Sequence, residues 1–148
     1  MSAADARRRV FVVCEDGSEY IDRFRRFLGQ SFDFVPAADF ASARDRVAGT
    51  DGLLLDLDFR RTPPDRLIDE QGRSAAAVDA GTRARLAETQ GILILRRLRA
   101  EGVATPAVLF ADLDDRPQAE FLQGTLAPLT LAPSRLGLRE LAALLRGY

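Results

Sequence analysis

The 148-residue sequence contains no histidine and no tryptophan, and it contains no lysine, because all 21 basic residues are arginines. The lack of histidine excludes Ser-His and Cys-His catalytic pairs, an imidazole base and histidine zinc sites. The lack of lysine excludes Schiff-base chemistry and the lysine of a phosphate-binding loop. Carboxylates therefore remain as the groups from which a functional site can be built.

A surplus of charge of either sign is also missing, since 21 basic residues face 22 acidic ones and the net charge is -1. We therefore expect no nucleic-acid partner and no membrane partner. No stretch is apolar for the roughly 20 residues of a membrane-spanning helix, and the start of the chain lacks a signal-peptide pattern. We expect a cytoplasmic protein with a single domain over residues 1–148.

The one cysteine, Cys14, cannot form an internal disulfide. A buried, low-reactivity thiol and a redox sensor are the two alternatives. Its place at the end of an apolar run favours a small core residue.

Five short apolar runs predict β-strands. They cover residues 9–14, 32–35, 52–57, 107–111 and 129–131. Between them, apolar residues recur at helical spacing, which predicts amphipathic helices. We expect helix starts at Ser18, at Asp39 or Ser42, near Thr82, near Gln118 and at Ser134.

Two of these helices carry specific expectations. In the first, Phe24 and Phe27 belong to the apolar face that should turn toward the core. In the helix that continues after Gly91, the side chains of Arg96, Arg97 and Arg99 are expected to face water.

Strands that alternate with helices predict a parallel sheet covered on both faces. The expected fold class is α/β, a doubly wound five-stranded parallel sheet in a flavodoxin-like three-layer sandwich. Residues 60–90 interrupt the alternation, because the segment is polar, contains Pro63-Pro64 and is too long for an ordinary connection. We interpret it as an insertion between the third strand and the third helix, either a cover or docking surface for a site or a tolerated surface loop.

Acidic residues follow the strands at the expected carboxyl edge of the sheet, where sites of such folds gather. Glu15 and Asp16 follow the first strand, Asp56 and Asp58 end the third, and Asp112 follows the fourth. Asp112, Asp114 and Asp115 could extend a cation site, although a solvated loop is the simpler interpretation.

The order of these segments resembles the receiver domain of bacterial response regulators. The matches are Val12-Val13-Cys14-Glu15-Asp16, Asp51-Gly52-Leu53-Leu54-Leu55-Asp56, the helix that starts at Gly91-Ile92, Thr105-Pro106-Ala107-Val108 and Ala132-Pro133. The resemblance implies that Asp56 stands at the phosphate-accepting position. It also implies that Glu15, Asp16 and Asp56, with the backbone carbonyl of Asp58, would hold magnesium if the site were active.

Three positions depart from the pattern that the resemblance implies. Ala111 stands where the family has a hydroxyl residue, Ala132 where it has a lysine, and Leu129 where it has an aromatic residue that reports the switch. The first two substitutions remove groups that would bind the oxygens of a phosphoryl group.

We therefore expect an atypical receiver, or pseudo-receiver, which is not an enzyme and requires no cofactor. It would act in two-component signalling as a protein-protein interaction module, with a histidine kinase or a downstream effector as partner, in an oligomeric state that the sequence does not indicate. The alternative is a functional single-domain phosphorelay receiver, phosphorylated on Asp56 with a divalent cation. A flavin-binding protein of similar topology is disfavoured, because no hydroxyl-rich loop follows the first strand.

Overall fold

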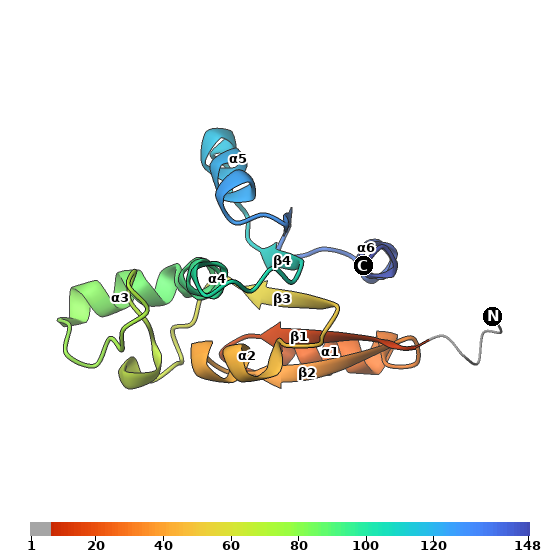
Figure 1. Ribbon diagram of the computed structural model, residues 1–148, viewed down its shortest axis with the longest axis horizontal. Helices are drawn as coiled ribbons and strands as arrows, with labels where there is room; N and C mark the ends of the chain where they lie inside the picture. Colours follow the sequence, from red (N-terminus) through yellow and green to blue (C-terminus); the bar gives the residue numbers. More distant parts are fainter. Residues whose placement is uncertain (1–6) are drawn as a thin grey trace.

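The computed structural model describes residues 7–148, so the first part of the chain start that we compared with a signal peptide lies outside the described residues. Five parallel strands form one sheet in the order β2-β1-β3-β4-β5 (Figure 1). They are β1 (Arg9–Cys14), β2 (Phe32–Ala37), β3 (Gly52–Asp56), β4 (Ala107–Phe110) and β5 (Leu129–Ala132). The predicted doubly wound five-stranded sheet is confirmed, with each strand end within two residues of the prediction.

Helices cover both faces of this sheet. One face packs against α1 (Glu19–Leu28) and α6 (Leu138–Arg146). The other packs against α2 (Phe40–Arg46), α4 (Gln90–Ala100) and α5 (Arg116–Thr125). Neighbouring strand residues point to opposite faces, so Val12 and Val13 belong to different cores.

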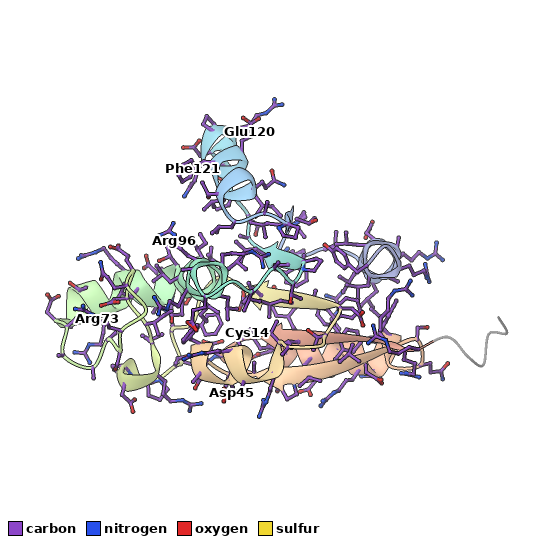
Figure 2. The ribbon with its side chains drawn as sticks, viewed as in Figure 1. Cys14, Asp45, Arg73, Arg96, Glu120 and Phe121 are labelled. Atoms are coloured by element: carbon purple, nitrogen blue, oxygen red, sulfur yellow. The ribbon has the colours of Figure 1, made fainter. Side chains whose placement is uncertain are left out.

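The prediction for Phe27 is wrong, because its side chain is 58% exposed whereas that of Phe24 is buried. Phe27 lines an open groove between α1 and α6 on the surface, together with Leu138 and Ala142. The Arg26 guanidinium lies 5.2 Å from the centre of its ring. On α5 the exposed aromatic side chain is Phe121, which projects from the outer part of the helix (Figure 2).

The helix starts depend on which side chain reaches the free backbone N–H groups. Asp39 and Ser42 both contribute at α2, where they form a reciprocal capping box. Helix α1 begins directly after Ser18, as predicted, but the Ser18 side chain makes no capping hydrogen bond. Helix α6 begins after Gly137, so the predicted start at Ser134 is wrong.

The insertion folds beyond the carboxyl ends of β1 and β3. In Figure 1 the arrowheads of both strands point toward it. It contains a short 3₁₀ helix, η2 (Pro64–Arg66), and the helix α3 (Ala80–Glu88). The buried Gln90 side chain fixes it, since its amide oxygen accepts from the Ile68 N–H at 2.9 Å and its amide nitrogen donates to the carbonyls of Ile68 and Leu86. The Phe59 N–H also donates to the Ala87 carbonyl at 2.8 Å.

Helix α3 is not continuous with α4, because the backbone leaves helical geometry at Thr89. In Figure 1, α3 runs across the view and α4 is seen end-on. The prediction that Arg96, Arg97 and Arg99 all face water is partly wrong. Arg99 is half-buried and donates to four backbone carbonyls, those of Val103, Thr105, Leu126 and Pro128.

Within the described residues 7–148, no helix is both long enough and apolar enough to cross a bilayer.

Candidate functional site

Acidic side chains from two neighbouring strand ends meet in a cavity at the carboxyl edge of the sheet. Asp16 follows β1, Asp56 is the last residue of β3, and Asp58 comes two positions later. With Arg60 and Arg61 from the start of the insertion, these three line a cavity of about 420 Å³. Three of the four predicted cation ligands therefore lie together, and the insertion supplies the neighbouring positive charge.

Glu15, the fourth predicted ligand, does not line this cavity. Its side chain is buried, and its two carboxylate oxygens accept from the N–H groups of Tyr20 at 3.0 Å and Ile21 at 2.9 Å. Glu15 thus caps the first turn of α1, the position for which Ser18 was predicted. Burial raises the pKa of Glu15, and the two N–H groups offset part of that rise.

Asp16 is held by Arg61 through both of its carboxylate oxygens. The Arg61 main-chain N–H donates to one oxygen at 2.9 Å, and the Arg61 guanidinium donates to the other at 2.9 Å. The same guanidinium makes a bidentate pair with Glu19, at 2.6 and 3.0 Å. Hydrogen bonding from Arg61 lowers the pKa of Glu19 to about 2, and its two acidic partners raise the pKa of Arg61.

Asp56 keeps a carboxyl group at the cavity. One of its oxygens accepts from the Leu57 N–H at 2.9 Å. Burial, with smaller contributions from the nearby charges of Asp16 and Asp58, raises the pKa of Asp56 to about 6.

The Asp58 side chain turns to its own loop, where it accepts from the Arg60 N–H at 2.9 Å and pairs with the Arg60 Nε at 2.6 Å. Within the part of the chain that the structure describes, no three Asp, Glu or Cys side chains are grouped so that they could hold a metal ion. The oxygens of Glu15 and Asp16 already accept hydrogen bonds, so in this arrangement the predicted ligand set does not fit a divalent cation.

The ends of β4 and β5 meet through two small residues. The Ala111 N–H donates to the Ala132 carbonyl at 2.9 Å, and both methyl side chains are buried. Neither side chain can donate a hydrogen bond, so this part of the edge offers a phosphoryl group no side-chain donor from these two positions. Leu129 lies at the opposite end of β5, half-buried against the core.

Ser134 bonds Asp112 and not the start of α6. Its N–H donates to one Asp112 oxygen at 3.1 Å, and its hydroxyl donates to the other. These bonds lower the pKa of Asp112. Asp115 caps α5 through the Gln118 N–H. The acidic triplet after β4 therefore serves local loop and helix structure at two of its positions.

Tyr20, on α1, lies close to the candidate site, although the sequence analysis did not single it out. Its ring stacks on Phe110 with centroids 5.0 Å apart, and its hydroxyl donates to the Ser134 carbonyl at 3.4 Å. Burial, followed by the nearby charges of Asp56, Glu15 and Asp112, raises the pKa of Tyr20 to about 12. A neutral phenol thus lies among the acids that follow three strands.

The two alternatives for Cys14 were a buried core residue and a redox sensor. Cys14, the last residue of β1, lies inside the molecule (Figure 2), and burial raises the pKa of its thiol. A thiol in that state is a poor redox sensor, so the core interpretation is favoured.

Comparison with known proteins gives similarity in structure but not in sequence. No protein-family model and no curated protein matches the chain. The Francisella response regulator 1452 receiver domain has 15% identity and a TM-score of 0.62, with 93% of each chain covered. The BeF3-activated N-terminal receiver domain of Klebsiella pneumoniae RstA has 20% identity and a TM-score of 0.61, covering 93% of this chain and 96% of that one.

A third structure, the signal receiver domain of a putative Luxo repressor protein from Vibrio parahaemolyticus, has 12% identity and a TM-score of 0.64. It covers 95% of this chain and 88% of that one. At such identities the likeness concerns the fold alone. The chain has the receiver fold of response regulators, with a helical insertion after β3.

Proposed function

We propose that this chain is a receiver-fold signalling module that acts by binding a protein partner without a phosphorylation switch. The partner would be a histidine kinase or a downstream effector of a bacterial two-component system. The proposed activity requires no cofactor and no catalytic residue, and it is not enzymatic.

The observation that carries this proposal is the engagement of Asp16 by Arg61. A divalent cation would have to displace two hydrogen bonds from Asp16 and would meet the guanidinium charge at close range. Ala111 and Ala132 add to the argument, because their side chains cannot bind phosphoryl oxygens. Without cation and donors, transfer to Asp56 loses the groups that would stabilise its transition state.

A second candidate function is a working phosphorelay receiver that is phosphorylated on Asp56 with magnesium. The observation in its favour is the shared cavity, which Arg60 and Arg61 line together with Asp56. An arginine there could partner a phosphoryl oxygen in place of the missing lysine.

One experiment separates the two candidates. The protein and its Asp56→Asn variant are incubated with magnesium and acetyl phosphate, and their intact masses are compared. We expect no mass change in either protein. A gain of one phosphoryl group in the wild type that is absent from Asp56→Asn would overturn the proposal in favour of the phosphorelay.

A magnesium titration followed by amide NMR gives an independent measurement. We expect no saturable shift at the amides of residues 15–17 and 56–58. Saturable shifts there would support the cation-dependent alternative. The Asp45→Asn variant controls for magnesium that binds loosely to surface carboxylates, since Asp45 lies on the exposed side of α2 (Figure 2).

A further inference from the structure

A second cavity, of about 410 Å³, lies between the start of the insertion and one face of α3. Its apolar wall includes Leu67, Ala84 and Ala87, and its polar groups come from Arg60, Thr62 and Arg83. A volume of this size is typical of a site for a small molecule, as is a mostly apolar lining with a few polar groups.

Two of the polar groups carry atoms without a hydrogen-bond partner in the described part of the chain. They are the hydroxyl oxygen of Thr62 and the Nε of Arg83, and both atoms are shielded from solvent. Thr62 is only 9% exposed, and its main-chain N–H is fixed to the Phe59 carbonyl at 3.1 Å. Buried polar atoms in folded proteins almost always have a partner, so two unpaired ones in residues that line one cavity point to a polar ligand.

The charge of the lining indicates the sign of that ligand. The cavity is lined by two arginines and by no carboxylate. Arg60 already pairs with Asp58, whereas Arg83 makes no ion pair within residues 7–148. The uncompensated positive charge of Arg83 therefore favours an anion.

We propose that this cavity binds a small monocarboxylate with a short apolar body. The two oxygens of a carboxylate match one guanidinium and one hydroxyl donor, as Arg83 and Thr62 provide. The hydrocarbon part would lie against Leu67 and the alanine face of α3. Inorganic phosphate suits the site less, because it has no apolar part to cover that face.

The proposed site adjoins the acidic cavity, since Arg60 lines both. A carboxylate in the second cavity would compete with Asp58 for the Arg60 guanidinium. The proposal does not depend on whether the chain is phosphorylated, because none of its groups takes part in the chemistry at Asp56.

The test is an amide NMR titration of the full chain with benzoate and with hexanoate, and with benzamide and inorganic phosphate as matched probes. We expect saturable shifts at Leu67, Ala84 and Ala87 with both carboxylates, and affinities at least about tenfold weaker for benzamide and phosphate. No saturable shift up to about 20 mM carboxylate would overturn the proposal, as would stronger binding of phosphate or shifts confined to other surfaces.

Variants locate the contact. We expect Arg83→Met and Thr62→Val each to weaken benzoate binding, Arg83→Met by about tenfold or more. Arg85→Met on the same helix should change it by less than about twofold, because Arg85 does not line this cavity. Equal affinity in wild type and both cavity variants would overturn the proposal. If Arg83→Met fails to fold, Thr62→Val decides alone, since it preserves shape and removes a hydroxyl that has no partner.

Discussion

Arg61 binds Asp16 with two different parts of one residue, its main-chain N–H and its guanidinium, each at 2.9 Å. The contact joins residues 45 positions apart in the chain and ties the insertion to the end of β1. Because the guanidinium also pairs with Glu19, one side chain neutralises two acids at the mouth of the candidate site.

Replacement of this arginine should change the titration of its neighbours. In Arg61→Gln, we expect the pKa of Glu19 to rise from about 2 toward its ordinary value of 4.5, because the pairing cation is gone. The pKa of Asp56 should rise above about 6 for the same reason. NMR titration of the side-chain carboxyl carbons measures both, and Arg60→Gln is the control for Glu19, because Arg60 pairs with Asp58 and not with Glu19. An unchanged pKa of Glu19 would show that the pair does not form in solution.

Asp56 should make the stability of the protein depend on pH. Its pKa is about 6 in the folded protein against an ordinary 3.8, so the folded state binds the proton more tightly. The stabilisation is complete below the unfolded pKa of 3.8 and is lost as pH rises through about 6. Asp56→Asn should therefore be more stable than wild type at about pH 8, by about 1 kcal/mol once partial exposure of the carboxyl is allowed for.

Urea denaturation of both proteins at about pH 4 and about pH 8 checks this, and the difference should nearly vanish at the lower pH. Asp45→Asn, on the exposed surface of α2, is the control for removal of a charge. A wild type that is no less stable than Asp56→Asn at the higher pH would contradict the raised pKa of Asp56.

Gln90 should be essential for the fold of the insertion. Gln90→Met keeps the length of the side chain but leaves the buried Ile68 N–H and carbonyl without their partners. We expect a loss of about 3 kcal/mol in the free energy of unfolding and faster amide exchange at Ile68. Gln123→Met on the exposed side of α5 should cost less than about 0.5 kcal/mol. Equal losses in the two variants would argue against the tether.

The two phenylalanines of α1 should differ sharply in their contribution to the free energy of unfolding. Phe24 is 1% exposed and contacts Phe34 and Phe110, so Phe24→Ala should cost about 4 kcal/mol. Phe27→Ala should cost less than about 0.5 kcal/mol, since that ring is mostly in solvent. Urea denaturation compares them, and similar losses would mean that Phe27 is covered in solution.

The fold and part of the site could be predicted because they depend on local patterns. Apolar runs specify buried parallel strands wherever they alternate with amphipathic helices, and the carboxyl ends of such strands share one edge. Asp16, Asp56 and Asp58 follow from that rule alone. Their meeting in one cavity confirms the predicted gathering of acids for these three residues, whereas Glu15 and Asp112 do not line the cavity.

Arg61 could not be predicted as the partner of Asp16, because its position depends on the path of the insertion. That path is set by distant contacts, such as those of Gln90 with Ile68 and of Phe59 with Ala87. The resemblance to receiver domains assigned Glu15 to a cation, but the direction of its side chain depends on the turn into α1. Arg99 likewise follows a water-facing spacing, yet the segments that lead into β4 and β5 offer it the carbonyls of Thr105 and Pro128.

Tyr20, which stacks on Phe110, gives the protein a native fluorescent probe. The chain has two tyrosines and no tryptophan, and the other phenol, Tyr148, lies near Thr130 at the opposite end of the sheet. Tyr148→Phe would leave a single emitter, surrounded by carboxylates whose ionisation alters its fluorescence. Ligand binding or loss of charge at this edge could then be followed in unlabelled protein by the fluorescence of Tyr20.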